Sequence, residues 1–110
     1  MLPLKITILG SQWEIIDKAS ETDYPNLKDA DGYCDFYAKQ IVLGEFTTAN
    51  GYEYADLESF RRKVLRHELV HAFLYESGMT QLARNEEVVD WFAIQAPKLL
   101  NMFQSLEVES

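Results

Sequence analysis

Two histidines and a glutamate lie within the five-residue segment HELVH, which runs from His67 to His71. These are the only two histidines of the chain. In a helix, residues four positions apart share a face, so both imidazole rings can reach one metal ion. Zn²⁺ accepts neutral imidazole nitrogens at about 2.0–2.1 Å. Glu68 lies beside the same face, where it can take a proton from a zinc-bound water.

The residues around this segment are apolar, as in RHELVHAFLYESG, and favour a helix packed into a core. Burying a polar group without a partner costs roughly 2–7 kcal/mol. Without a metal, the histidines would be surface residues of a helix or core residues with hydrogen-bond partners. One metal ion accounts for all three polar residues together, so we predict a zinc site.

A catalytic zinc site has three protein ligands and leaves the fourth position to water. Because the chain has no third histidine, the third ligand is expected to be a carboxylate. Glu86, fifteen residues after His71, is the first candidate, and Glu87 is the alternative. Asp90 lies one helical turn beyond Glu86, so one carboxylate can bind the metal while the other accepts a hydrogen bond from a ligand histidine. As ordinary residues, the two glutamates would favour a helix's first turn and Asp90 could cap a neighbouring segment.

The first part of the chain alternates in the manner of β-strands. LKITIL and QWEIID are predicted strands with a turn at Gly10–Ser11, and residues 18–32 are predicted to form a loop or a short irregular helix. GYCDFYAKQIVLGE then predicts two short strands with a turn near Tyr37–Lys39. Asn50-Gly51 is the strongest hairpin signal; it closes a short ribbon or lies in the loop before the first helix.

The hydrophobic period changes to that of an α-helix at Asp56, which is the expected N-cap. Gly78 is the expected end of this helix. The predicted core stripe consists of Leu57, Phe60, Val64, His67, His71 and Leu74.

A second helix is predicted to begin between Thr80 and Asn85 and to include EEVVDWFAIQA. Its apolar residues surround the axis almost completely, which predicts a buried helix in which Asp90 is the polar exception. Pro97 is expected to stop or kink it, and KLLNMFQSLEV to supply a terminal amphipathic helix. Because the predicted strands come first and the predicted helices follow, the sequence predicts an α+β fold with a small antiparallel or mixed sheet.

The 110 residues, 47% of them hydrophobic, predict one domain over 1–110. A formal net charge of -8 makes a nucleic-acid partner or a polybasic membrane anchor unexpected, and no segment reads as a signal peptide or a membrane span. The single cysteine, Cys34, is expected to be a small buried residue, and a cytoplasmic location follows from this cysteine usage. The basic residues of the first helix are expected to be its solvated face, paired with the acidic sheet region; they are Arg61, Arg62, Lys63 and Arg66.

With HELVH followed by NEEVVDWFA, the sequence resembles the gluzincins, whose second signature is a glutamate ligand with an aspartate four residues later on a helix. It is more closely similar to the small ImmA/IrrE-type metallopeptidases, including phage-encoded minimal forms. In these, a short sheet, the HExxH helix and an E-x-x-x-[DN]-x-F-A helix make up nearly the whole catalytic unit. The resemblance covers residues 32–100 well and residues 1–31 weakly.

The resemblance implies that His67, His71 and Glu86 bind zinc, that Glu68 is the general base and that Asp90 orients His67. The interval between His71 and Glu86 is shorter than in larger gluzincins, which implies a minimal, shallow site.

Zincins also usually carry a residue that stabilises the oxyanion. Tyr75 or a tyrosine of Tyr52–Tyr54 could serve here, although packing roles suit all six tyrosines.

The expected function is that of a zinc-dependent metallopeptidase (a hydrolase) that cleaves a peptide or protein, such as a regulatory protein, by Glu-assisted attack of zinc-bound water. The alternative is a non-enzymatic, zinc-stabilised protein-binding module on the same scaffold. In that case a fourth protein ligand, such as Cys34 or Glu87, would close the site. A metal-free helical module is the third interpretation.

Overall fold

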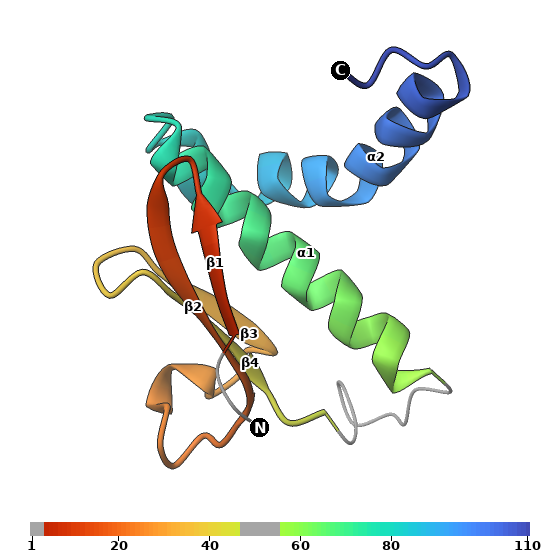
Figure 1. Ribbon diagram of the computed structural model, residues 1–110. Coiled ribbons are helices and arrows are strands. Elements are labelled where there is room, and N and C mark those ends of the chain that lie inside the picture. The colour runs from red at the N-terminus through yellow and green to blue at the C-terminus, as the bar shows by residue number, and fades with distance from the viewer. Residues whose placement is uncertain (1–3, 47–55) are drawn as a thin grey trace.

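The computed structural model describes residues 4–46 and 56–110 of the chain. Strands come first and two long helices follow, which confirms the expected α+β class (Figure 1). The strands are β1 (Leu4–Ile8), β2 (Ser11–Ala19), β3 (Gly32–Asp35) and β4 (Gln40–Gly44). The long helices are α1 (Leu57–Glu76) and α2 (Glu86–Ser105), and the short 3₁₀ helices are η1 (Pro25–Leu27) and η2 (Leu82–Arg84).

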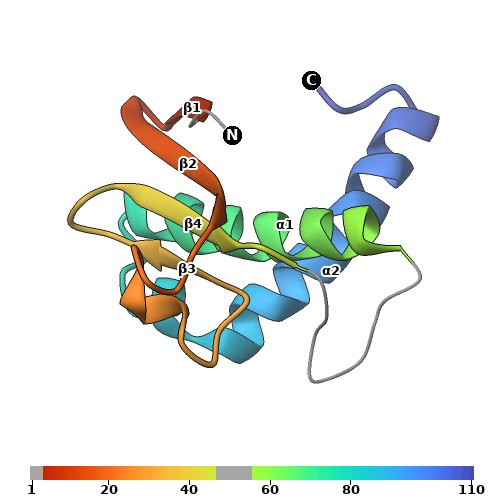
Figure 2. The same ribbon diagram turned by 90° about the horizontal axis from the view of Figure 1, so that it is seen from below.

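The strands form one mixed sheet in the order β1-β2-β4-β3. The central pair, β2 and β4, is parallel, and the two outer pairs are antiparallel. One face of the sheet packs against α1, which crosses it diagonally (Figures 1 and 2). Trp13, Ile41 and Leu43 are fully buried in this layer and meet Ala72 of α1. β3 is therefore an edge strand that lies beside the HELVH helix.

The turn between β1 and β2 lies one residue earlier than predicted. Leu9 and Gly10 occupy it with φ of 47° and 90°, and Ser11 already pairs with Ile8. Positive φ at both central residues is the signature of a two-residue hairpin turn, and glycine adopts it at no steric cost.

The predicted turn between β3 and β4 is confirmed. The side chain of Asp35 accepts hydrogen bonds from the backbone N–H groups of Tyr37 and Ala38 at 3.0 and 2.9 Å. η1 lies within the polar segment predicted to be a loop or a short irregular helix. The Asn50-Gly51 hairpin prediction falls outside the described residues.

The ends of α1 are those expected from the sequence. Asp56 caps its N-terminus, because its side chain accepts a hydrogen bond from the backbone N–H of Ser59 at 2.9 Å. At the other end Gly78 has φ of 94°, and the N–H of Met79 donates to the carbonyl of Leu74 at 3.0 Å. This is the left-handed end for which glycine is preferred.

The predicted pairing of basic helix residues with the sheet is confirmed for Arg61. Its Nε donates to both carboxylate oxygens of Asp17 at 3.0 and 2.9 Å, and Asp17 is only 4% exposed. These hydrogen bonds raise the pKa of Arg61. Arg62 instead pairs with Glu58 of its own helix at 3.7 Å. The Arg61–Asp17 pair therefore fastens the first half of α1 to β2.

The prediction of a buried second helix is wrong. Only Val89 and Ala93 of α2 are buried, while Trp91, Phe92 and Ile94 are 58%, 40% and 39% exposed. In the described part of the chain, α2 packs mainly on α1 and η2, so one side of the helix is covered. An apolar pattern around the whole axis did not reveal that the fold covers only one side.

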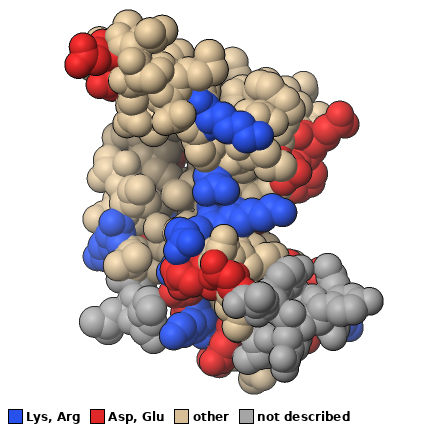
Figure 3. Space-filling model, turned by 90° about the vertical axis from the view of Figure 1, so that its right-hand side faces the viewer, with Lys and Arg blue, Asp and Glu red and all other residues tan. Residues whose placement is uncertain are grey.

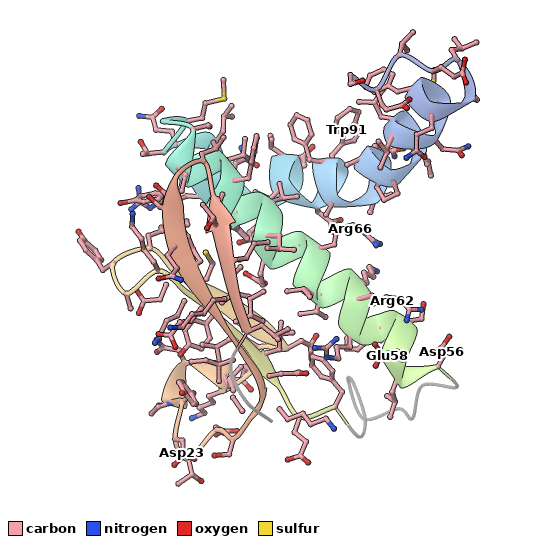
Figure 4. All side chains as sticks on the ribbon, in the orientation of Figure 1. Asp23, Asp56, Glu58, Arg62, Arg66 and Trp91 are labelled. Carbon is pink, nitrogen blue, oxygen red and sulfur yellow. The ribbon has the colours of Figure 1, made fainter. Side chains whose placement is uncertain are left out.

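Pro97 lies inside α2, which continues to Ser105 as one helix and changes direction about midway (Figure 1). Proline has no N–H, so it cannot donate to the carbonyl four residues earlier, that of Ala93. Nε of Arg66 donates to this carbonyl at 2.8 Å, and in Figure 4 Arg66 points from α1 towards α2. A side chain of α1 thus replaces the hydrogen bond that proline removes.

Candidate metal centre

Three predicted ligands come together where α1 and α2 meet. The Nε2 atoms of His67 and His71 lie 3.2 Å apart. Oε2 of Glu86 lies 2.9 Å from Nε2 of His67, and Oε1 of Glu86 lies 3.0 Å from Nε2 of His71. The helical spacing aligns the two histidines, and the η2 turn returns the chain so that the first residue of α2 faces them.

The spacing and chemistry of these atoms fit zinc. Tetrahedral bonds of 2.0–2.1 Å place neighbouring donor atoms about 3.3 Å apart, within a few tenths of an ångström of the distances between these side chains. Two imidazole nitrogens and one carboxylate oxygen are also a ligand set of catalytic zinc sites. Within residues 4–46 and 56–110, the group able to hold a metal consists of His67, His71 and Glu86, without Cys34 or Glu87.

The buried histidine is oriented by the backbone. His71 is 6% exposed, and its Nδ1 makes a short hydrogen bond with the carbonyl of Ala83 in η2. Because a carbonyl can only accept, Nδ1 carries the proton and Nε2 presents its lone pair to the site. Sequence reasoning did not predict the contact with Ala83, because a residue of any type can supply a backbone carbonyl.

Asp90 lies beside the other histidine, as expected. Its Oδ1 is 3.4 Å from Nδ1 of His67, longer than a hydrogen bond of ordinary length but close enough for electrostatic orientation of the ring. The expectation that Asp90 is buried is wrong, because its side chain is 53% exposed. The cause is the one-sided packing of α2, which leaves this face open to the cavity.

Glu86 is also exposed, at 72% of its side chain, so Glu86 and Asp90 are not a buried pair. The helix start explains its position. Asn85 is the N-cap and accepts a hydrogen bond from the N–H of Val88 at 3.0 Å, which makes Glu86 the first residue of α2. The carboxylate therefore reaches the histidines from an open rim.

Glu68 is buried within α1, at 7% exposure, and lines the same cavity as the histidines. Burial raises the pKa of Glu68 to about 7, His71 lowers it, and Glu86 raises it further. A divalent cation at the site would lower this pKa again. A carboxyl group that titrates near neutral pH is suited to accept and release a proton.

The cavity has a volume of about 660 Å³ and lies between the β3 edge and the two long helices. Its floor is formed by α1, and its sides by residues 30–34 and by η2 with the start of α2. Gly32 allows the close approach of β3 to its surroundings, because a Cβ there would lie 2.9 Å from the carbonyl oxygen of Val42 and 3.0 Å from Val64 Cγ1.

Basic residues that sequence reasoning did not place at the site also line the cavity. Lys63, Arg66 and Arg84 are among its lining residues, and the guanidinium of Arg84 lies 5.5 Å above the ring of Phe36. Figure 3 shows Lys and Arg side chains gathered in the middle of one face of the molecule. Arg84 immediately precedes Asn85, the N-cap of α2, and is two residues before the predicted ligand Glu86. This closeness in the sequence was the signal that could have placed Arg84 at the site.

The residues considered for other roles at the site lie as follows. Tyr75 stacks on Phe36 with ring centroids 4.5 Å apart and is absent from the described residues that line the cavity. Tyr52–Tyr54 lies outside the described residues. Cys34 is in β3, as expected, and is half-buried; burial raises the pKa of its thiol.

A scan against protein-family models, a search of curated proteins and a search of solved structures each find no match to this chain. None of the described helices is long and apolar enough to cross a bilayer.

Proposed function

We propose that this chain is a zinc-dependent metallopeptidase of the gluzincin type. The observation that carries the proposal is the convergence of His67, His71 and Glu86 beside the buried carboxyl group of Glu68. The sequence resemblance to ImmA/IrrE-type enzymes supports the same assignment. The single cysteine favours a reducing compartment such as the cytoplasm.

His67, His71 and Glu86 would hold the zinc ion. Bound zinc supplies two effects, a lowered pKa of water to about 7 and polarisation of a carbonyl group. Glu68 accepts the proton of the attacking water and passes it to the leaving amine. Asp90 and the Ala83 carbonyl hold the two imidazole rings in position.

The substrate class follows from the strand beside the cavity. Among the described strands β3 pairs with β4 alone, and its residues Gly32, Tyr33 and Cys34 line the cavity. An extended peptide can add to such an edge through backbone hydrogen bonds, which require no particular side chains. A peptide or a protein with an exposed extended segment, such as a regulatory protein, is therefore the proposed substrate.

The second candidate function is a protein-binding module in which zinc only stabilises the fold. A structural zinc site is closed by four protein ligands. The described residues supply a group of three, with Glu86 on an exposed rim, and this open arrangement favours the peptidase.

The test compares the wild-type chain with Glu68→Gln, both loaded with zinc and assayed against a quenched-fluorescence peptide library. Glu68→Gln should retain about one zinc per chain and lose hydrolysis by about 10²–10⁴-fold, because an amide cannot act as the base. Glu87→Gln is the matched control and should keep both zinc and hydrolysis, since Glu87 is outside the ligand group. Undiminished hydrolysis by Glu68→Gln would contradict the role of Glu68, and loss of hydrolysis together with zinc would not support it.

A further inference from the structure

From Phe92 to its C-cap Leu106, α2 carries an apolar face. Its main stripe advances by alternating steps of four and three residues and consists of Phe92, Ala96, Leu99, Phe103 and Leu106. Leu99, Phe103 and Leu106 are 47%, 41% and 74% exposed. Alternating steps of four and three residues are the pattern by which two helices pack along a common seam. We call this stripe, together with the flanking Leu100 and Met102, the arm face.

The described part of the chain leaves the arm face uncovered. α2 packs mainly on α1 and η2, and its buried residues, Val89 and Ala93, both precede Pro97. Beyond the bend the helix projects from the body in Figure 1, with no other described element drawn beside it, and its far end also stands clear in Figure 2. In Figure 4 Trp91 also points away from α1.

The area of the arm face suits a small dimer interface. Phe92, Leu99, Leu100, Met102, Phe103 and Leu106 are 40–74% exposed. At about 80–100 Å² each they offer roughly 500–600 Å², the upper end of what monomeric proteins expose as one patch. Two such faces would bury about 1,000–1,200 Å² in total, the lower limit for a specific interface.

The charge distribution favours an identical partner. Residues 91–106 contain a single charged residue, Lys98, although the whole chain has a formal net charge of -8. Because Lys98 is not part of the arm face, two arms can pair without burying a charge. A strongly charged partner helix would find no counter-charges there.

We infer that the arm face packs against the same face of a second copy of this chain, forming a two-fold symmetric dimer. An uncharged seam with this repeat is complementary to itself, as a symmetric interface requires. Glu86 and Asp90 line the cavity, whereas none of the arm-face residues does, so pairing of the arm faces leaves both metal centres open to substrate. The inference does not depend on the proposed activity.

Sedimentation velocity from about 1 to 200 μM tests the dimer. The mass of the wild-type chain should rise from 12.7 kDa towards twice that value. The double variant Leu99→Glu/Phe103→Glu should stay monomeric at every concentration, because pairing would bury its new charges. Asn101→Glu/Gln104→Glu is the matched control on the polar side of the same turns and should still dimerise.

Two results would overturn the inference. One is a wild-type chain that remains at 12.7 kDa at 200 μM. This result would mean that the arm face does not pair with a second copy and that any partner is a different protein. The other is a dimer that persists in Leu99→Glu/Phe103→Glu. Amide hydrogen exchange of the wild-type chain keeps the test decisive if that variant does not fold. Exchange in residues 97–106 should slow as concentration rises, and exchange independent of concentration contradicts the dimer.

Discussion

Arg66 and Pro97 should be energetically coupled through one backbone carbonyl. Arg66 Nε donates to the carbonyl of Ala93 at 2.8 Å, and Pro97 is the residue whose missing N–H leaves that carbonyl free. Arg66→Met keeps most of the aliphatic stem but removes the donor. Leaving a carbonyl unsatisfied costs about 1–3 kcal/mol, and because Arg66 is half-buried, we expect about 1–1.5 kcal/mol.

The cost should depend on the residue at position 97. Pro97→Ala restores an N–H that can donate to the carbonyl of Ala93 within the helix. In that background Arg66→Met should cost less than about 0.5 kcal/mol, so the coupling free energy is about 1 kcal/mol. Urea unfolding of the wild-type chain, the two single variants and the double variant measures it. A chelator is needed throughout, because metal binding to the folded state would add its own stabilisation.

Equal costs of Arg66→Met in the two backgrounds would refute this reasoning. Such a result would mean that water satisfies the Ala93 carbonyl when Arg66 is removed, or that Arg66 stabilises the chain through its charge alone. Arg62→Met is a suitable control for lost charge on the same helix. Arg62 makes its ion pair with Glu58, so its cost should be small and independent of Pro97.

Two further predictions concern the residue that orients a metal ligand and the pH dependence of stability. Asp90→Asn should weaken zinc binding by about tenfold in competition with a chromogenic chelator, since Asp90 orients His67 from an exposed position; unchanged affinity would contradict this role. Hydrogen bonds from Trp13 Nε1 at 2.7 Å and from Lys39 lower the pKa of Glu76 below its usual value of 4.5. The stabilisation from Glu76 is therefore complete above about pH 4.5 and is lost as the pH falls through the lower folded-state pKa. Glu76→Gln should show a smaller loss of unfolding free energy between pH 6 and pH 3 than the wild-type chain, and identical losses would contradict this assignment.

Local signals in the sequence predicted α1 closely. Asp56 and Gly78 act through their own side chain and backbone geometry, so their effect is readable from a few residues. The same holds for the two histidines, because the helical period alone places them on one face. The order of the strands was not readable, since the parallel pairing of β2 with β4 depends on contacts between distant segments.

The burial of α2 could not be predicted from the sequence. Apolar residues on every side of α2 predict burial, but burial depends on how many elements surround the helix, and the described fold supplies a cover on one side. The same difference explains why Asp90 was correctly placed near His67 and wrongly expected to be buried. The bond between Arg66 and the Ala93 carbonyl joins residues 27 positions apart and could not be anticipated from either segment.

The most direct test of the metal centre is the zinc content of the purified chain, measured by native mass spectrometry and elemental analysis beside Glu86→Ala and Glu87→Ala. We expect about one zinc per chain in the wild-type protein and in Glu87→Ala, and a strong reduction in Glu86→Ala, because Glu86 alone of the two faces the histidines. A wild-type chain that binds no zinc even when zinc is supplied would contradict the metal centre and the peptidase proposal with it.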